Sequence, residues 1–319
     1  MKKNLLGRTG LWVSEAGFGA LPIGPSQRAL PVSEGAALLR RALDAGINFI
    51  DTAQYYQTYP YIREALAGRS DKSDIVISSK SLCADYEGMW LAIEEARKEL
   101  DREVIDIFLM HEVRSGQIPH RMGAFQALIE AREKGLVRAI GLSTHHVDIA
   151  ESAASIPELD VVFPLINYAG LGIRRGNEFA SCTEMETAIR ACSQAGKGVF
   201  AMKAFGGGAL TGNYQKALNY VFGLPEIQSV MIGFGAMSEI DDILAYLDGS
   251  MPPDYNPDIS QKRVRISQDD CEGCGACKSA CPNSAVFYNQ NGLAEIDQTI
   301  CLTCGYCAPV CPVRAIIMY

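Results

Sequence analysis

The sequence predicts an α/β protein built from a (β/α)8 barrel, residues 1–248, a proline-rich linker, residues 249–265, and a small α+β domain, residues 266–319. Two observations predict this fold class. In the first part, short apolar runs alternate eight times with charged helical patterns, and eight is the number of strands in a (β/α)8 barrel. The last part holds eight of the eleven cysteines and repeats one short plan twice.

The barrel strands are expected at the apolar runs 15–19, 48–50, 75–78, 105–110, 139–142, 161–164, 198–202 and 230–232. Helices are expected between them, among others at 33–45, 87–100, 122–134, 183–195 and 238–247. Gly46, Gly135 and Gly196 follow three of these helices, as glycine commonly does at a helix C-terminus. A doubly wound open sheet would show similar periodicity, although Gly17 and Gly19 lack the third glycine of a dinucleotide-binding turn.

The segment 249–265 contains Pro252, Pro253 and Pro257, which predict an extended linker. Its seventeen residues can span ~55 Å, enough to return from the eighth helix along the outside of the barrel. The halves 266–290 and 296–319 each contain a short strand, a cysteine loop, a helical turn and an apolar end. We therefore expect internal twofold symmetry in the last domain.

The cysteines of this domain form two copies of the pattern C-x2-C-x2-C-x3-C-P. Three thiolates at such gaps can surround one cuboidal iron–sulfur cluster, while the fourth cysteine, before the proline, ligates a second cluster. The predicted ligands are Cys271, Cys274, Cys277 and Cys311 for cluster one, and Cys301, Cys304, Cys307 and Cys281 for cluster two. In this segment the chain resembles a bacterial ferredoxin with two [4Fe-4S] clusters.

A zinc module or a disulfide scaffold would also use many cysteines, but both fit less well. Zinc sites usually join two close pairs across a longer loop. Disulfides need an oxidising compartment, and the N-terminus has no apolar stretch long enough for a signal peptide. We expect a reducing cytoplasm, no membrane span, and free thiols at Cys83, Cys182 and Cys192.

The charge of the chain argues against two classes of partner. There are 29 basic and 37 acidic residues, a net charge of −8, and no basic run. Nucleic acids and anionic membrane surfaces attract basic patches. Neither is therefore expected to bind this protein.

Four polar residues lie at or just after the ends of predicted strands: Asp51, Tyr56, Lys80 and His111. In a barrel these ends share one mouth, where active sites lie. Each residue alone has a simpler interpretation. Asp51 and Lys80 can form a structural ion pair, Tyr56 can belong to an aromatic cluster, and His111 can be an ordinary buried histidine.

The segments that carry these residues resemble the aldo/keto reductase family, over residues 1 to about 248. The resemblance rests on 48–56 (NFIDTAQYY), 77–80 (ISSK), 106–111 (DIFLMH), 135–143 (GLVRAIGLS) and 208–212 (GALTG). It implies interconversion of a small carbonyl compound and its alcohol, with Tyr56 as proton donor and hydride from a nicotinamide. Lys80 is then expected to favour the phenolate of Tyr56, Asp51 to hold Lys80 charged, and His111 to orient the carbonyl oxygen.

By the same resemblance, the nucleotide positions are Ser143, Thr144, Phe163, Met202, Lys203, Phe205, Gly206, Gly207, Gly233 and Gly235. Three of them depart from the family pattern. Phe163 replaces the glutamine and Thr144 the asparagine that bind the carboxamide, and Met202 replaces the stacking aromatic residue. The glycines after Lys203 can admit a pyrophosphate, or they form a tight turn. The eighth loop lacks a basic residue, which predicts NAD(H) rather than NADP(H).

Four functions remain open from the sequence. The first is an iron–sulfur aldo/keto reductase whose clusters exchange electrons with a carrier, such as a redox partner protein. The second is an electron-transfer protein with a degenerate barrel. The third is a reductase driven by ferredoxin electrons rather than by a nicotinamide, and the fourth is a reductase with structural clusters. We further hypothesise that the C-terminal domain or the linker covers part of the mouth and shapes the substrate pocket.

Overall fold

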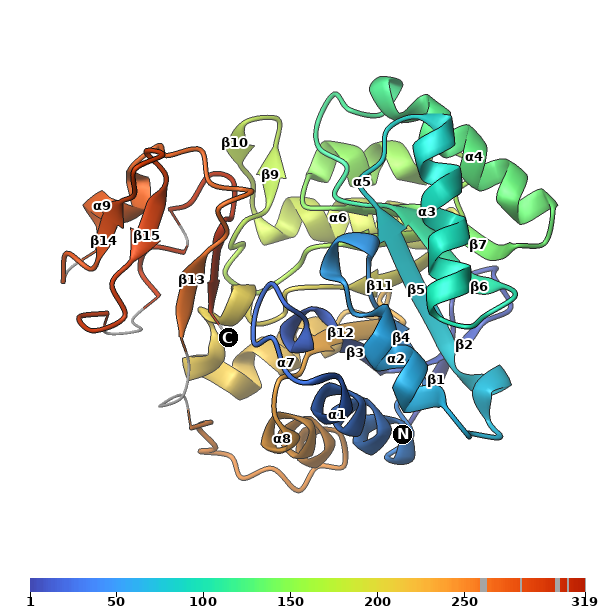
Figure 1. The fold of residues 1–319 in the computed structure, drawn as a ribbon, viewed down its shortest axis with the longest axis horizontal. Helices are drawn as coiled ribbons and strands as arrows, with labels where there is room; N and C mark the ends of the chain where they lie inside the picture. The colour runs from blue at the N-terminus through green and yellow to red at the C-terminus, as the bar shows by residue number, and fades with distance from the viewer. Residues whose placement is uncertain (259–262, 282, 302–304, 309, 319) are drawn as a thin grey trace.

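The computed structural model describes residues 1–258, 263–281, 283–301, 305–308 and 310–318. Eight parallel strands close a barrel in the order β11-β12-β3-β4-β5-β6-β7-β8 (Figure 1). Their bounds are β3 (Ala16–Gly19), β4 (Phe49–Asp51), β5 (Val76–Ser81), β6 (Ile105–Met110), β7 (Val137–Thr144), β8 (Val161–Pro164), β11 (Gly198–Ala201) and β12 (Ser229–Gly233). The predicted barrel is confirmed, and the open sheet is excluded because β12 pairs with β3.

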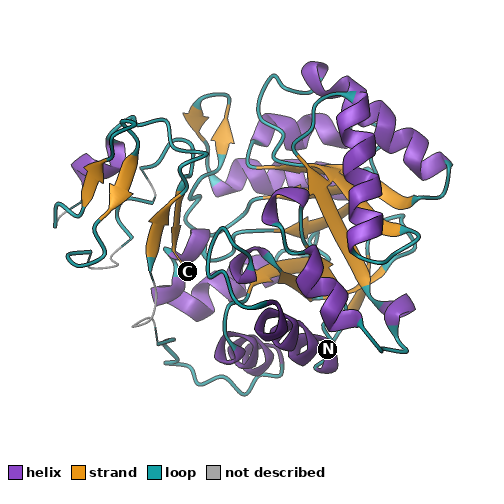
Figure 2. Ribbon diagram, viewed as in Figure 1, coloured by secondary structure: helices purple, strands orange, loops and turns teal. Residues whose placement is uncertain are grey.

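One helix follows each barrel strand and packs on the outside of the barrel (Figure 2). These helices are α1 (Val32–Asp44), α2 (Tyr59–Leu66), α3 (Tyr86–Glu99), α4 (Met122–Glu133), α5 (Val147–Ala154), α6 (Cys182–Gln194), α7 (Tyr214–Phe222) and α8 (Met237–Leu247). Side chains cap two of the starts, since Asp85 accepts from the Gly88 amide and Ser181 forms a capping box with Glu184. The glycine expected after α4, Gly135, has a φ of 73°, the left-handed conformation that ends helices.

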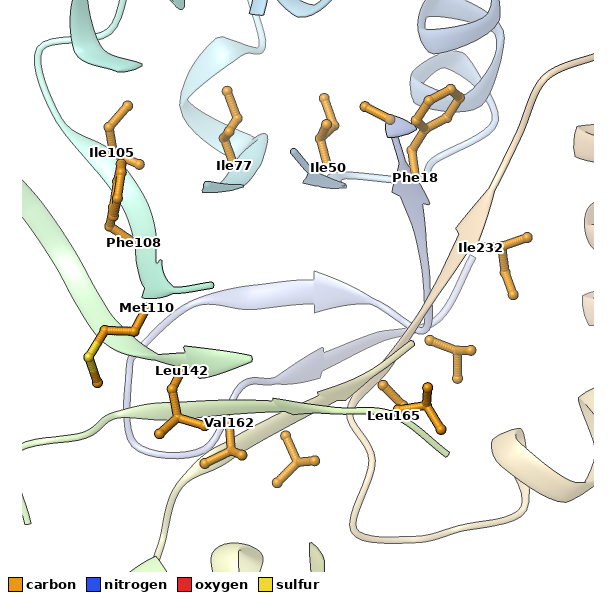
Figure 3. Packing of buried hydrophobic residues seen from close by; sticks show 14 of the residues in the cluster. Phe18, Ile50, Ile77, Ile105, Phe108, Met110, Leu142, Val162, Leu165 and Ile232 are labelled. Atoms are coloured by element: carbon orange, nitrogen blue, oxygen red, sulfur yellow. The ribbon is translucent and has the colours of Figure 1, made fainter. Parts of the chain in front are cut away.

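Alternation along the strands determines which side chains enter the barrel. Phe49, Val76 and Ile107 point inward and pack with Phe163 and Phe200. Their neighbours in sequence point outward to the helices, in the cluster drawn in Figure 3, which includes Ile50, Ile77 and Phe108. Two or four residues further along these strands, the inward positions reach the mouth of the barrel. Polar side chains at these positions therefore converge there.

The opposite end of the barrel is closed by an antiparallel hairpin of β1 (Lys3–Leu5) and β2 (Trp12–Ser14). Leu6, Leu11 and Val13 from this hairpin pack into the interior cluster and are almost fully buried. This end is therefore blocked by apolar side chains, and the mouth at the C-terminal ends of the strands is left for a site.

The C-terminal domain consists of two small antiparallel pairs and a short helix, α9 (Ala276–Ala280). One pair joins β13 (Val264–Ile266) to β16 (Ile316–Met318), and the other joins β14 (Val286–Tyr288) to β15 (Ala294–Ile296). β13, at the start of the first half, thus pairs with β16, at the end of the second half. β15, at the start of the second half, pairs with β14, at the end of the first half. This exchange is the twofold plan expected from the two cysteine motifs.

The described part of the linker runs along the barrel beside α7 and α8. Met251 and Tyr255 pack against the outer core, and the Tyr255 ring meets the Tyr214 ring edge-on at 5.6 Å. The C-terminal domain then lies beside the barrel, with β13 and β16 nearest to it (Figure 1). Arg174 of the barrel donates to the carbonyl of Pro312, and Arg265 donates to the carbonyl of Ser26. Within the described ranges, no helix is long and apolar enough to cross a membrane.

Candidate active site and cluster domain

A cavity of about 470 Å³ lies between the barrel mouth and the C-terminal domain. The barrel contributes Tyr56, Lys80 and His111 to its wall. The C-terminal domain contributes, among others, Asp269, Asp270, Ala308, Val313, Arg314 and Ile316. The hypothesis that this domain covers part of the mouth therefore agrees with the structure.

Asp51 and Lys80 form a buried ion pair at the bottom of the cavity. Lys80 Nζ lies 2.8 and 2.7 Å from the two carboxylate oxygens of Asp51 and donates a third bond to the Thr52 carbonyl. Burial raises the pKa of Asp51 and lowers the pKa of Lys80, and each charge opposes the shift of the other. Because all three ammonium protons are bonded, we treat the pair as charged.

Tyr56 lies above this pair, in the short helix η2 (Gln54–Tyr56). Lys80 Nζ is 4.6 Å from the centre of its ring rather than at its hydroxyl. Burial, followed by the charges of Asp51 and Glu112, raises the pKa of Tyr56 well above its ordinary value. This direction is opposite to the one expected from Lys80, because loss of solvent outweighs the ammonium. Tyr56 is therefore a neutral phenol, a form that can donate a proton.

His111 lies directly after β6, with Nε2 3.4 Å from the Tyr56 hydroxyl. Burial, then the charges of Lys80 and Arg121, lowers the pKa of His111 well below its ordinary value, so the ring is neutral at pH 7. Its Nδ1 atom is buried and has no partner among the described residues. Arg121 holds this loop by donating to the backbone carbonyls of His111, Ser81 and Cys83.

The structure divides the ten predicted nucleotide positions into two groups. Five line the cavity, namely Ser143, Met202, Lys203, Gly206 and Gly207. The other five, Thr144, Phe163, Phe205, Gly233 and Gly235, are not part of its wall. The cavity therefore does not extend over the whole predicted nucleotide path.

The carboxamide positions do not fit a nicotinamide amide. Thr144 is fully buried, and its hydroxyl donates to the Val113 carbonyl and accepts from the His146 amide. Phe163 stacks on Phe200 at 4.2 Å inside the barrel and offers no polar atom. The hydroxyl of Ser143 accepts from the Glu112 amide at 2.8 Å. A nicotinamide carboxamide would therefore need hydrogen-bond partners other than Thr144, Phe163 and Ser143.

The glycine loop after β11 is only partly open. The amides of Gly206 and Gly208 already donate within the loop, to the carbonyls of Lys203 and Phe205. A side chain at Gly208 would lie 2.7 Å from the side chain of Met318 in β16, whereas one at Gly207 would meet nothing within 4 Å. The C-terminal domain thus covers one end of the loop that is predicted to hold a pyrophosphate.

A basic side chain lies at the eighth loop, although none occurs in its sequence. Arg28, from the segment between β3 and α1, donates to the Gly235 carbonyl at 2.6 Å, and Glu239 accepts from the Gly235 amide. The predicted NAD(H) preference is based on the sequence of the eighth loop and its helix, which contain no lysine or arginine. Arg28 adds a cation beside this loop, so the preference stays a prediction.

The described cysteines Cys271, Cys277, Cys281, Cys301, Cys307 and Cys311 pack in or against one small core, and their pairing into two ligand sets stays a prediction. Burial raises the pKa of the Cys277 thiol, and the next largest influence is the charge of Cys311, followed by Cys271 and Cys274, which are the other predicted ligands of cluster one. Of the predicted ligands of cluster two, Cys281, Cys301 and Cys307 pack in the same core, and Cys304 lies outside the described residues.

Backbone amides also point at the sulfurs. Gly273 and Ala294 donate to Cys271 Sγ, and Ala285 donates to Cys281 Sγ at 3.2 Å. Such bonds stabilise cluster thiolates and tune their potential. Among the described residues no three metal-ligating side chains converge closely enough for a single ion. A cuboidal cluster spaces its thiolates farther apart than a mononuclear site does, so this donor set fits iron–sulfur clusters.

Several residues of the cavity were not predicted from the sequence. Arg314 comes from the loop after Cys311, and Tyr55 donates to Asp269 across the domain boundary at 2.9 Å. His145 could have been found, because it follows a predicted strand at the same end as Tyr56 and His111. The others depend on how the C-terminal domain is placed.

The fold and the residues at its mouth define an oxidoreductase barrel joined to an iron–sulfur domain. A model described as the aldo/keto reductase family matches residues 15–226, and a model described as a 4Fe-4S dicluster domain matches residues 263–313. The chain belongs to the aldo/keto reductase family, whose members are typically NAD(P)-dependent oxidoreductases acting on small carbonyl compounds. The dicluster domain implies two [4Fe-4S] clusters.

Two of the similar proteins are dehydrogenases. L-galactose dehydrogenase of Arabidopsis thaliana is 26% identical over 281 residues, 75% of this chain and 86% of that protein. D-threo-aldose 1-dehydrogenase of a Pseudomonas species is 26% identical over 234 residues, 63% of this chain and 68% of that protein. The holo form of an aldo-keto reductase from Bacillus halodurans superposes with a TM-score of 0.64 at 17% identity, covering 78% of this chain and 91% of that one. At this identity the structural likeness shows the fold alone.

Proposed function

We propose that this protein interconverts a small carbonyl compound and its alcohol in the cavity under the C-terminal domain, and that its two clusters exchange electrons with an external carrier. The observation that carries the proposal is the convergence of Tyr56, His111 and the Asp51–Lys80 pair at one mouth. In reduction, the carbonyl carbon gains a hydride and the oxygen gains a proton. The product alcohol thus holds two electrons and two protons more than the carbonyl.

The protein residues supply the proton and the orientation. Tyr56, neutral because burial raises its pKa, donates the proton to the carbonyl oxygen. His111 directs an Nε2–H at the same oxygen, since its lowered pKa keeps the ring neutral. Lys80, fixed by Asp51, places a positive charge beneath the Tyr56 ring that favours the phenolate left after donation.

The family implies a nicotinamide nucleotide, which supplies or accepts hydride when it is bound. The open Gly207 can face its phosphates, but the carboxamide positions Thr144 and Phe163 do not fit. We therefore assign no residue to the nicotinamide ring. Substitution of Arg28, which lies at the eighth loop, tests the choice between NAD(H) and NADP(H).

The environment of the clusters supports exchange with both the cavity and an outside carrier. Asp270 and Val313 line the cavity and lie one and two residues from the ligands Cys271 and Cys311, at most ~4 and ~8 Å between Cα atoms. On the outer surface Ile300, Tyr306 and Val310, each next to a predicted ligand, are exposed. Exposed apolar side chains beside the predicted ligands suit contact with a transient redox partner.

A second candidate function is reduction of the carbonyl by cluster electrons without a nicotinamide. It is favoured by the poor fit of the carboxamide positions and by Met318, which lies against the glycine loop. Two electrons from a reduced ferredoxin-type carrier and two protons would then complete the alcohol. Oxygen-sensitive clusters and the free thiols Cys83, Cys182 and Cys192 make a reducing compartment, such as the cytoplasm, part of either proposal.

An anaerobic titration of the cluster-loaded protein with NADH and NADPH tests the proposal. Cluster absorbance and nicotinamide fluorescence are followed together, and turnover is then measured with simple aldehydes. Nucleotide binding with cluster bleaching supports a route from hydride to clusters. Binding and turnover without bleaching would leave a reductase with structural clusters. If neither nucleotide binds, reduction by a reduced ferredoxin separates the second candidate from an electron-transfer protein without catalysis.

A further inference from the structure

Two cations reach the cavity without an acidic partner. Among the described residues, Lys203 has no hydrogen bond or ion pair from its ammonium group. Arg314 donates from Nη2 to the Leu171 carbonyl at 3.2 Å, while its Nη1 is buried and has no partner among the residues that the structure describes. A buried donor without a partner is costly, so such groups usually await a ligand or water.

The acidic groups of the cavity are occupied or more distant. Glu112 forms an ion pair with Arg114 at 2.9 Å, and Asp269 accepts from the Tyr55 hydroxyl at 2.9 Å. Asp270 lies near enough to influence Lys203 but not within 4.0 Å of it as an ion pair. Among the described residues, no carboxylate therefore forms an ion pair with Lys203 or Arg314, although the charge of Glu112 acts on both.

The position of both cations is fixed by the backbone. Lys203 and Arg314 have φ angles of 64° and 60°, in the left-handed region that residues other than glycine rarely occupy. The Arg314 guanidinium lies over Gly172, where a Cβ atom would come within 1.9 Å of its Nε. Strained backbone of this kind is retained mainly at functional sites.

Both cations remain charged near neutral pH. Burial, followed by the charge of Arg314, lowers the pKa of Lys203 to about 8. Arg314 stays charged because a guanidinium is not deprotonated in proteins. His145, which also lines the cavity, stays neutral because burial, and then the charges of Arg314 and Lys203, hold its pKa well below the ordinary value. Two positive groups and one neutral ring thus line the same cavity as the proton donor.

We propose that Arg314 and Lys203 bind the anionic group, a carboxylate or a phosphate, of the carbonyl substrate. This inference rests on the proposed function, because it places the reacting carbonyl at Tyr56 and His111 in the same cavity. Arg314 offers a planar pair of donors that matches a carboxylate or phosphate, and Lys203 adds a second charge. The C-terminal domain thereby supplies a specificity residue to the barrel.

The anion is assigned to the substrate rather than to a nucleotide because of where the two cations lie. The eighth loop, at Gly233 and Gly235, is outside this cavity, and Arg28 lies against it. Met318 covers Gly208 at one end of the glycine loop. A compound that carries both a carbonyl and an anionic group can contact both sets of residues, because they line the same cavity.

The test compares matched carbonyl compounds on the cluster-loaded full chain. Butanal is paired with 4-oxobutanoate, and glyceraldehyde with glyceraldehyde 3-phosphate, so each pair differs by an anionic group. The variants are Arg314→Met and Lys203→Met, and the control is Arg190→Met, an exposed arginine that does not line the cavity. We expect the kcat/KM ratio of anionic to neutral compound to fall on the order of 10- to 100-fold in Arg314→Met, and to be unchanged in the control.

Other outcomes have defined meanings. Equal losses for both members of a pair would show that Arg314 is structural and overturn the proposal. A fall in NADH or NADPH affinity, with the anionic-to-neutral ratio unchanged, would assign the cations to the nucleotide and also overturn it. If wild-type protein turns over none of these compounds, the proposed function fails. Binding of succinate and inorganic phosphate can still be measured by calorimetry. Binding to the wild-type protein that is lost in Arg314→Met would support the anion site, and no binding to the wild-type protein would refute the anion site.

Discussion

Replacing Lys80 with methionine tests the ion pair at the centre of the site. The side chains of Lys80 and Asp51 are 1% and 6% exposed, so solvent screens their interaction little. Removing one member of such a pair costs about 3–5 kcal/mol, because the other charge stays buried without a partner. For a domain of this size, that loss lowers the melting temperature by roughly 6–20 °C. Far-UV circular dichroism of the cluster-loaded protein measures it.

The double variant Asp51→Asn, Lys80→Met provides the matched control. Removing both charges of a buried pair is often nearly neutral, so most of the lost stability should return. Carbonyl reduction should stay low in both variants, because the charge beneath the Tyr56 ring is absent from each. The comparison thus separates the structural effect of the pair from its effect on proton transfer.

The single variant should also lose stability as the pH rises. Burial raises the pKa of Asp51 above its ordinary value of 3.8, and in Lys80→Met the opposing ammonium is gone. The folded state then binds more protons than the unfolded state, so stability falls from about pH 4 upward through the raised pKa. The reasoning would be refuted if Lys80→Met were as stable as the wild-type protein at pH 7. It would also be refuted if the double variant were no more stable than Lys80→Met.

Four further outcomes are expected. Tyr56→Phe should reduce carbonyl turnover by roughly 10²- to 10⁴-fold with unchanged melting temperature; activity within a few-fold of wild type would remove Tyr56 as proton donor. Arg28→Ala should weaken NADPH more than NADH in fluorescence titrations if Arg28 faces a 2′-phosphate, and equal changes would exclude that role. Gly273→Ala should lower iron and sulfide content, because its Cβ would lie 2.5 Å from the Gly292 carbonyl; Gly68→Ala, also at positive φ but in open space, is the control. Binding of 4-oxobutanoate should lower the midpoint potential of a cluster, measured by electron paramagnetic resonance, and an unchanged or higher potential would contradict this.

The barrel and the position of four site residues follow from local rules. Alternation along β4 and β5 places Asp51 and Lys80 on the inner face two and four residues after Phe49 and Val76. Strand ends of a parallel barrel share one mouth, so their convergence could be predicted without knowing any contact. Their catalytic roles stay predictions.

Features that depend on packing between distant segments could not be predicted. Arg28 reaches the eighth loop across more than two hundred residues of sequence, and Arg314 reaches the cavity only because the C-terminal domain lies over it. The sequence also predicted the wrong direction for the pKa shift of Tyr56, for a similar reason. A sequence shows that a lysine is near, whereas desolvation depends on everything else that surrounds the phenol.

The loop after Cys311 joins substrate recognition to the clusters. Arg314 is three residues from this predicted ligand, at most ~11 Å between Cα atoms. An electron added to that cluster increases the negative charge near the proposed anion site and weakens binding there. Coupling between two sites is reciprocal, so a bound anion must make the cluster harder to reduce by the same free energy. Reduction of the anionic substrate would therefore be easiest when electrons leave the cluster as the anion binds. This coupling gives a physical reason for the C-terminal domain to provide both Arg314 and the cluster ligand Cys311.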